Sequence, residues 1–223
     1  MCRVDRPGTV LFVHTEPAIL YRSENWLVLA KPSGWHSVAG SGDEPDIETW
    51  LRTRVPACSM LEEAGLVHRL DLPTSGCLLA ATDHSTRQEL RDVMSGRGDL
   101  NITKQYLARC RVGLAEQGEF DLHFTTRHRG SRKVTVSAQG EPHSRGRCEW
   151  RVLSRDSHRG ELVRVDLLGP GRRHVIRAGF AHLGHPLAGD ELYGGQAGTP
   201  QLHAWALVVG DVRVESPPPV WAT

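Results

Sequence analysis

The 223-residue sequence contains no long hydrophobic run and few cysteines. No apolar stretch approaches the roughly 18 residues that a transmembrane helix needs. The N-terminus lacks the basic, apolar and small-residue regions of a secretory signal. The five cysteines are an odd number and form no CxxC pair, which argues against a disulfide framework and against a thiolate zinc site. We therefore expect a cytoplasmic protein with free thiols and no association with a membrane.

Motifs of several common enzyme classes are also missing. The sequence has no Gly-rich dinucleotide fingerprint, no GxxxxGK[ST] phosphate loop and no HExxH zinc motif. A hydrolase with a GxSxG elbow is disfavoured because Thr74-Ser75-Gly76 lacks the first glycine. His174, His182 and His185 lie close in sequence, but no carboxylate or thiolate completes a tetrahedral ligand set. We therefore do not expect a zinc site.

The net charge of +1 hides an uneven distribution of charge along the chain. Residues 127–177 contain 13 Lys and Arg against 5 Asp and Glu, a local charge of +8. The rest of the chain contains 14 against 21, a local charge of −7. Such asymmetry is typical of a protein that turns one face toward a polyanion such as nucleic acid. The alternative is that these arginines only solvate the exposed faces of strands.

The hydrophobic pattern predicts many short strands and a few helices. Strands are expected over residues 10–14, 18–22, 26–30, 77–81, 102–112, 132–138, 147–153, 161–168, 203–209 and 211–215. Helices are expected over residues 46–54 with Asp46 as N-cap, over 85–97 with a Ser85–Gln88 capping box, and over 173–183. The pattern therefore predicts an α+β fold with a mainly antiparallel or mixed central sheet and flanking helices and loops.

The segment from His68 to Gly76 is the first that can carry chemistry. Asp71 follows an apolar strand end and precedes a Pro-Thr-Ser-Gly turn, so its carboxylate is expected at the edge of a sheet, where sites are usually built. His68 and Arg69 add positive charge that favours the ionised carboxylate. The alternative is that Asp71 only caps the turn through the local backbone.

Two further segments place basic residues where they can meet a nucleic acid. Residues 171–177 follow a Gly-Pro-Gly break and open a helix, where free N–H groups favour an anion. Arg172 and Arg177 could hold phosphate there, pair with a buried carboxylate, or be ordinary surface arginines. Lys104 and Tyr106 share one face of a strand. Tyr106 could stack on a nucleobase or be half-buried core.

Together and in order, these segments resemble the RluA-type family of RNA pseudouridine synthases. The matching motifs are Lys31-Pro32-Ser33-Gly34, His68-Arg69-Leu70-Asp71, Thr74-Ser75-Gly76, Lys104-Gln105-Tyr106-Leu107-Ala108, Gly171-Arg172, His174, Ile176-Arg177, Leu183-Gly184-His185-Pro186, Gly189-Asp190, Tyr193-Gly194 and Leu202-His203-Ala204. The resemblance implies the pseudouridine synthase catalytic fold over residues 18–210. Residues 1–17 are then an N-terminal extension, residues 211–223 a C-terminal strand and Pro-rich tail, and no S4-type RNA-binding domain is expected.

The resemblance also implies a function, namely conversion of specific uridines in ribosomal or transfer RNA stem-loops to pseudouridine without metal or cofactor. It implies Asp71 as the catalytic carboxylate, Arg177 as its ion-pair partner and Tyr106 as the residue that stacks on a flipped-out uracil. We expect a monomer that binds RNA through its basic residues, namely Arg69, Lys104, Arg172, Arg129, Arg132 and Lys133. The alternative is a catalytically inactive RNA-binding module of the same fold.

Three residues depart from the family pattern. Val175 stands where the family usually has Gln, Gly179 where it usually has His, and Arg173 where it usually has a small Thr. We expect these changes to make the helix that contacts the substrate unusual. We also expect Arg129, Arg132 and Lys133 to lie away from the catalytic motifs.

Overall fold

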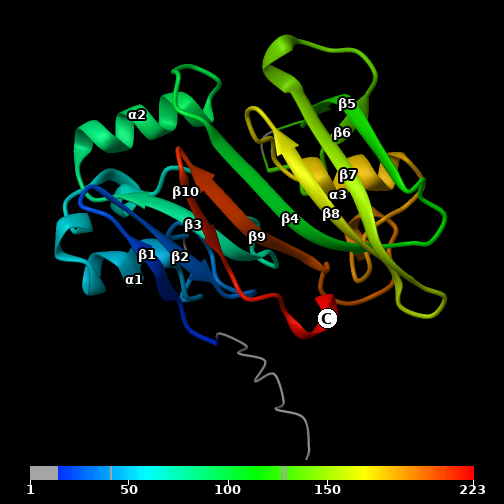
Figure 1. Ribbon diagram of the computed structural model, residues 1–223, viewed down its shortest axis with the longest axis horizontal. Coiled ribbons are helices and arrows are strands. Elements are labelled where there is room, and N and C mark those ends of the chain that lie inside the picture. Colours follow the sequence, from blue (N-terminus) through cyan, green and yellow to red (C-terminus); the bar gives the residue numbers. More distant parts are fainter. Residues whose placement is uncertain (1–14, 41, 127, 129) are drawn as a thin grey trace, which may run out of the picture.

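A computed structural model describes residues 15–40, 42–126, 128 and 130–223 and contains a 10-stranded mixed sheet (Figure 1). The strands are β1 (Ala18–Arg22), β2 (Trp26–Lys31), β3 (Ser75–Ala81), β4 (Ile102–Cys110), β5 (Gln117–Thr125), β6 (Thr135–Ser137), β7 (Arg145–Asp156), β8 (Gly160–Leu168), β9 (Leu202–Val209) and β10 (Val212–Glu215). The helices are α1 (Ile47–Arg54), α2 (His84–Met94) and α3 (Val175–His182). This architecture confirms the predicted α+β fold.

The strands follow the order β1-β2-β3-β9-β4-β8-β7-β5-β6, and β10 pairs with β9. The β3–β9 pair is parallel, whereas the other pairs of described strands are antiparallel. In Figure 1, β4 and β9 lie between a half that carries α1 and α2 and a half that carries α3. The central strands therefore join two halves of one continuous sheet.

Alternation along β2 sends its apolar side chains to two hydrophobic clusters. Leu27 and Leu29 belong to the cluster that contains Leu51 of α1, whereas Val28 belongs to the cluster that contains Leu90 of α2. Successive residues of a strand point to opposite faces, so α1 and α2 cover opposite sides of β2 and β3. The sequence of β2 is almost continuously apolar because both faces of this strand are buried.

Helix α3 packs on β5, β6 and β7 and explains two of the three departures from the family pattern. A Cβ atom at Gly179 would lie 2.4 Å from Cζ of Phe120, so the Phe120 ring fills the space that a larger residue would occupy. Val175 is buried, and its Cγ2 lies 2.7 Å from the position that a Cβ of Gly146 would take. Both departures therefore fit the packing of α3 against the sheet.

Most elements agree with the sequence pattern, and the differences have local causes. Residues 10–14 lie outside the described residues. Strand β5 was not predicted, although its residues alternate between buried and exposed along its length. Helix α2 is capped by Asp83, which accepts from Thr86 N at 2.8 Å, so the predicted Ser85–Gln88 capping box is wrong. Helix α3 begins at Val175 because His174 has a positive φ of 55°.

The cap of α1 and the final hairpin follow the prediction. Asp46 accepts from Thr49 N at 2.7 Å, as an N-cap should. Strands β9 and β10 pair around Gly210, whose φ of 58° suits the turn. Among the described residues, no helix is both long enough and apolar enough to cross a membrane.

Candidate active site

Asp71 lies in the turn before β3, and the buried Lys31 holds this turn in place. Lys31 ends β2 and is 1% exposed. Its Nζ donates to the carbonyls of Pro32, Trp35 and Leu72 at 3.0, 2.6 and 3.2 Å. Burial lowers the pKa of Lys31 to about 7, and the charge of Asp71 opposes that shift. One ammonium group therefore fastens the loop after β2 to the turn that carries Asp71.

Arg177 of α3 connects Asp71 to a second carboxylate. Its Nη1 donates to Oδ2 of Asp71 at 3.3 Å. Its Nε and Nη2 donate to the two carboxylate oxygens of Asp190 at 2.7 and 2.8 Å. Burial lowers the pKa of Arg177, but the hydrogen bonds and charge of Asp190 outweigh it, so the pKa lies above its usual value. The bidentate partner of Arg177 is thus the fully buried Asp190, and Asp71 takes the remaining nitrogen.

His174 approaches the same carboxylate oxygen of Asp71 as Arg177 does. Its Nε2 lies 3.8 Å from Oδ2 of Asp71, and its Nδ1 lies 2.7 Å from Oη of Tyr193. Oη of Tyr193 also accepts from Val134 N at 3.0 Å, so we assign its proton to the bond with Nδ1. In that tautomer Nε2 carries a proton toward Asp71. Burial lowers the pKa of His174, and Asp71 opposes the shift.

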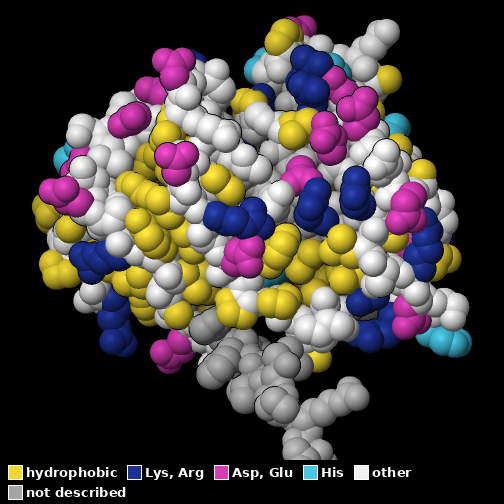
Figure 2. Space-filling model, viewed as in Figure 1, with side chains coloured by type: hydrophobic (Ala, Val, Ile, Leu, Met, Phe, Trp, Pro, Cys, Tyr) yellow, Lys and Arg dark blue, Asp and Glu magenta, His cyan; other side chains and the backbone are white. Residues whose placement is uncertain are grey.

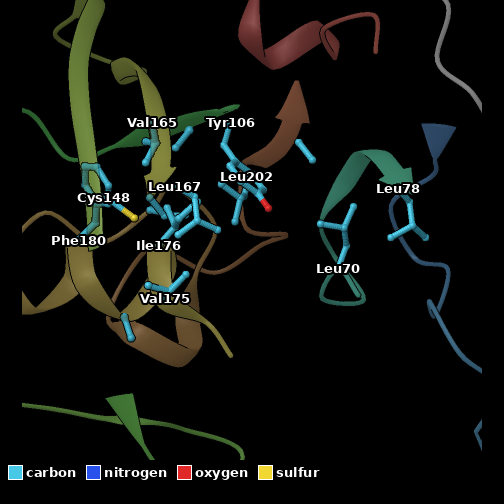
Figure 3. Close-up of a cluster of buried hydrophobic side chains, with 14 of the residues drawn as sticks. Leu70, Leu78, Tyr106, Cys148, Val165, Leu167, Val175, Ile176, Phe180 and Leu202 are labelled. Carbon is cyan, nitrogen blue, oxygen red and sulfur yellow. The ribbon is translucent and has the colours of Figure 1, made fainter. Parts of the chain in front are cut away.

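A first depression of about 570 Å³ opens beside Asp71. Tyr106 of β4, Ile176 of α3 and Leu202 of β9 supply apolar surface to its lining. Figure 3 shows the Tyr106 hydroxyl pointing toward the segment that carries Leu70. Burial raises the pKa of Tyr106, so its hydroxyl stays protonated. An aromatic ring at the floor of a cavity beside a carboxylate is suited to hold a planar base.

Cationic residues surround this first depression. Arg69, Arg91, Lys104, Arg172, Arg173 and Arg177 line it, and Asp71 is the single carboxylate among its lining residues. Nζ of Lys104 donates to the carbonyl of Gly169 at 2.8 Å, and burial lowers the pKa of Lys104 to about 8. His68 accepts from Leu79 N at 3.1 Å, and burial lowers its pKa to about 3, so it stays neutral. The cavity therefore favours an anionic ligand.

A second depression of about 960 Å³ also opens beside Asp71. Asp71, His174 and Arg177 line both depressions. Arg132 and Lys133 line the second one. The expectation that they lie away from the catalytic motifs is therefore wrong. Arg129 lies outside the described residues, so its position stays a prediction.

The basic stretch is less uniform than its local charge of +8 suggests. On β7 and β8, arginines pair with carboxylates: Arg145 and Arg147 with Asp121, Arg155 with Glu116 and Glu161, and Arg164 with Asp166. In Figure 2, dark blue and magenta side chains are mixed over this half of the molecule. Among the described residues, no ion pair neutralises six cations that line the depressions, namely Arg69, Lys104, Arg132, Lys133, Arg172 and Arg173. Several cations without an ion pair among the described residues thus lie around Asp71.

Known proteins of one family are similar to this chain in sequence and in fold. The sequence pattern described as RNA pseudouridylate synthase matches residues 25–182, more than half of the chain. The chain belongs to the RNA pseudouridylate synthase family. This finding confirms the family predicted from the motifs.

The chain is similar to several curated family members. It is 34% identical over 195 residues to ribosomal large subunit pseudouridine synthase D of Xylella fastidiosa, a match that covers 85% of this chain and 55% of that protein. It is 35% identical over 226 residues to ribosomal large subunit pseudouridine synthase C of Salmonella typhi, covering 89% of this chain and 66% of that protein. The chain thus spans between about half and two thirds of the length of these relatives.

Two solved human structures have the same fold as this pseudouridylate synthase family member. Human RNA pseudouridylate synthase domain containing 1 has a TM-score of 0.68 and 25% identity, with 96% of this chain and 86% of that chain covered. Human RNA pseudouridylate synthase domain containing 4 has a TM-score of 0.71 at 19% identity, with 92% and 89% covered, and shows the fold alone.

The structure does not support the alternative in which Asp71 only caps its turn. The turn closes through the backbone, because Thr74 N donates to the carbonyl of Asp71 at 2.9 Å. Among the described residues, the side chain of Asp71 is hydrogen-bonded to Arg177 alone. The predicted anion site at the start of the helix is also displaced, because α3 begins at Val175, after Arg172. Arg172 instead lines the first depression.

Sequence reasoning assigned no role to four residues of this family member's site, namely Lys31, His174, Asp190 and Tyr193. Each lies within a motif that carried the family resemblance. The signal was therefore present in the sequence, but their partners lie far along the chain. Asp190, for example, meets Arg177 only because the segment after α3 turns back toward Asp71.

Proposed function

We propose that this chain is an RNA pseudouridine synthase that isomerises uridine in large-subunit ribosomal RNA. The observation that carries the proposal is the position of Asp71. Its carboxylate is fixed by Arg177 at 3.3 Å beside a cavity that has an aromatic residue in its lining and unpaired cations around it. The substrate class comes from the names of the two bacterial relatives, which are ribosomal large subunit pseudouridine synthases.

The reaction is an isomerisation and requires a base to leave its stack. The bond between N1 of uracil and C1′ of ribose breaks, the uracil turns, and its C5 bonds to C1′. The proton on C5 then leaves, and N1 gains a proton, so atoms and charge balance. Unstacking costs a few kcal/mol, so we expect a target uridine in a loop or another weakly paired region.

Asp71 supplies the group that starts the reaction. As an ionised carboxylate it can attack C1′ or take a proton from the ribose, and both steps require it close to the sugar. Arg177 holds one carboxylate oxygen of Asp71 at 3.3 Å, which fixes the direction of the carboxylate and leaves the other oxygen for the substrate. Asp190 in turn fixes the guanidinium plane.

Tyr106 holds the flipped uracil by stacking. Stacking needs only the ring, and such contacts are worth about 1–3 kcal/mol per base. A role for the hydroxyl in taking the C5 proton is less favoured. Burial raises the pKa of Tyr106, so the phenol would first have to give up its own proton.

The unpaired cations bind the RNA backbone. Arg69, Lys104 and Arg172 line the depression that receives the base, and they contact its flanking phosphates. The chemistry uses only groups of the protein and the RNA, so we propose activity without metal or cofactor. We place the activity in a reducing cytoplasm, since the four described cysteines are free and buried.

Incubation with an unmodified transcript of large-subunit ribosomal RNA tests this function. The protein is incubated with the transcript in a metal chelator, and carbodiimide-resistant uridine adducts are mapped. We expect product with the wild type and none with Asp71→Asn, at equal RNA affinity and melting temperature. Binding without product in the wild type would support the inactive RNA-binding module instead. A requirement for metal, or full activity of Asp71→Asn, would refute the proposed chemistry.

A further inference from the structure

The second depression has no task in the reaction at Asp71, yet it adjoins that residue. RNA is a continuous polymer, so a nucleotide held at Asp71 has a neighbour on its 5′ side and another on its 3′ side. The first depression accommodates the base and one of these strands. The other strand must leave the site in a different direction, and the second depression is also lined by Asp71 but includes Arg132 and Lys133, which the first does not.

The segment from Ser131 to Val134 forms one wall of this depression and has its backbone held at several points. Arg173 donates to the carbonyl of Ser131 at 2.6 Å through Nη1 and to the carbonyl of Arg132 at 3.1 Å through Nη2. Oγ of Ser131 donates to the carbonyl of Lys133 at 2.8 Å. Val134 N donates to Oη of Tyr193 at 3.0 Å.

These contacts use the backbone and leave two side chains available. Arg132 and Lys133 are exposed and line the depression, and among the described residues neither side chain has a hydrogen-bond or ion-pair partner. Nearby arginines of the same basic stretch are neutralised by carboxylates, as Arg145 is by Asp121. Uncompensated cations held side by side repel one another, and a polyanion relieves that repulsion.

Arg173 connects this wall to the reacting group. It lines both depressions and precedes His174, whose Nε2 lies 3.8 Å from Asp71. A small Thr at this position could not reach the two carbonyls that the guanidinium holds. Arg173 is therefore a positioning residue, and its planar fork suits two acceptors in a way that a lysine ammonium does not.

We propose that the second depression binds the sugar-phosphate backbone of the RNA strand leaving the flipped uridine, and that Arg173 clamps residues 131–133 so that Arg132 and Lys133 face its phosphates. This inference rests on the proposed function of the site. Glu191 lines the same depression and adds negative charge. The Glu191 carboxylate therefore opposes phosphate binding. Removing its charge should strengthen RNA binding, whereas removing the charges of Arg132 and Lys133 should weaken it.

Salt-dependent RNA binding tests whether the second depression binds the departing RNA strand. We call this proposed binding site, lined by Arg132 and Lys133, the strand site. A labelled single-stranded RNA of mixed sequence is bound by wild type and by the double variant Arg132→Gln, Lys133→Gln. Loss of two phosphate contacts should reduce the slope of log affinity against log salt by about 1.4 and weaken binding roughly tenfold near 0.1 M salt. Glu191→Gln should strengthen binding. Both side chains of the double variant are exposed and make no hydrogen bond or ion pair within the described part of the chain, so its melting temperature should match the wild type.

The matched control is the double variant Arg151→Gln, Arg159→Gln. It removes the same charge from the same basic stretch, and neither residue lines either of the two depressions described above. We expect a change of slope well below that of the test pair. Equal losses in both pairs, or no loss in the test pair, would overturn the strand site.

The clamp is tested by comparing Arg173→Lys with Arg173→Met. If Arg173 acts by holding two carbonyls, the lysine variant keeps the charge but behaves like the methionine variant, with a KM for RNA raised about tenfold and a much smaller effect on kcat. Full rescue of KM by lysine would show that only the charge matters and would refute the clamp. Equal losses in kcat and KM would assign Arg173 to the reaction itself and also refute it.

The strand site and the proposed function fail in different ways. Binding slopes are measured without turnover, and they can be repeated in the Asp71→Asn background. A wild type that forms no pseudouridine, with slopes as expected, would refute the function and leave the strand site standing as an RNA site. A wild type that forms pseudouridine, with slope and KM unchanged in the Arg132 and Lys133 variant, would refute the strand site alone.

Discussion

At the scale of single residues, the site depends on how the hydrogen bonds of one arginine are shared between two carboxylates. Arg177 gives its planar edge, Nε and Nη2, to Asp190 and one further nitrogen to Asp71. Asp190 is fully buried, so loss of its partner would leave an uncompensated charge in the interior. Asp71 keeps 25% of its side chain exposed and remains accessible to a substrate.

Arg177→Lys should therefore damage catalysis more than binding. Lysine keeps the charge but cannot hold both oxygens of Asp190 and still reach Asp71. We expect kcat to fall about a hundredfold, the size of effect expected when a reacting group is misplaced by an ångström. The affinity for RNA should stay within about twofold. Single-turnover kinetics and filter binding measure the two quantities, and a loss confined to binding would make Arg177 a phosphate contact.

Lys104 should make RNA binding depend on pH. Burial lowers its pKa to about 8, so the ammonium is charged below that pH and loses its charge as the pH rises through it. RNA favours the charged form, so affinity should fall by up to about tenfold per pH unit above pH 8, because binding then takes up a proton. Lys104→Arg should remove this fall, whereas the control Lys133→Arg should keep it. Titrations of labelled RNA between pH 7 and 9 decide the matter, and identical profiles for all three proteins would contradict it.

At the scale of elements, helix α3 holds Arg177 against Asp71 through close packing on the sheet. Phe120 of β5 contacts Phe180 with ring centroids 6.1 Å apart, and Trp150 of β7 lies 5.6 Å from the same ring. Gly179 lets the helix approach the Phe120 ring. The position of Arg177 relative to Asp71 therefore depends on aromatic residues that line neither depression.

Gly179→Ala should destabilise the protein even though alanine is the better helix former. The added Cβ would lie 2.4 Å from Phe120, and such overpacking costs about 1–3 kcal/mol. In a Phe120→Leu background the same change should be neutral or stabilise by up to about 1 kcal/mol, the gain in helix propensity. Urea denaturation of the four proteins in this double-mutant cycle measures the coupling. Additive effects would show that the ring does not occupy this space.

At the scale of the whole molecule, the site is assembled from both halves of the sheet. Asp71 comes from the half with α1 and α2, Tyr106 from the central β4, and Arg177 from the half with α3 (Figure 1). A substrate in the site must therefore contact both halves. The two depressions share Asp71, but Arg69 and Lys104 line only the first, whereas Arg132 and Lys133 line only the second.

Amide hydrogen exchange should show protection in both halves at once. When the Asp71→Asn protein binds a large-subunit ribosomal RNA fragment, we expect amide exchange to become slower at residues 68–74 and at residues 131–134 than in the free protein. The turn at residues 23–25, which lies outside both depressions, is the internal control and should be unchanged. Protection of the first segment alone would mean that the RNA does not enter the second depression.

The sequence by itself determined the family and most of the elements, and it led to the proposal of Asp71, Tyr106 and Arg177 as site residues. Strand alternation and the Asp46 cap are local properties, and both were read correctly from neighbouring residues. Strand β5 was missed despite a clear alternation of buried and exposed residues. The motifs that surround Asp71, Tyr106 and Arg177 carried the family resemblance.

Only the tertiary structure decided how those residues are connected. Asp71 and Arg177 are 106 positions apart, and Arg173 meets the carbonyl of Ser131 across 42 positions. Which carboxylate receives the arginine fork, and whether Arg132 faces the site or the solvent, depends on strand order and on the packing of α3. Periodicity reports which face of an element a side chain occupies, whereas such contacts depend on where the chain brings those faces together.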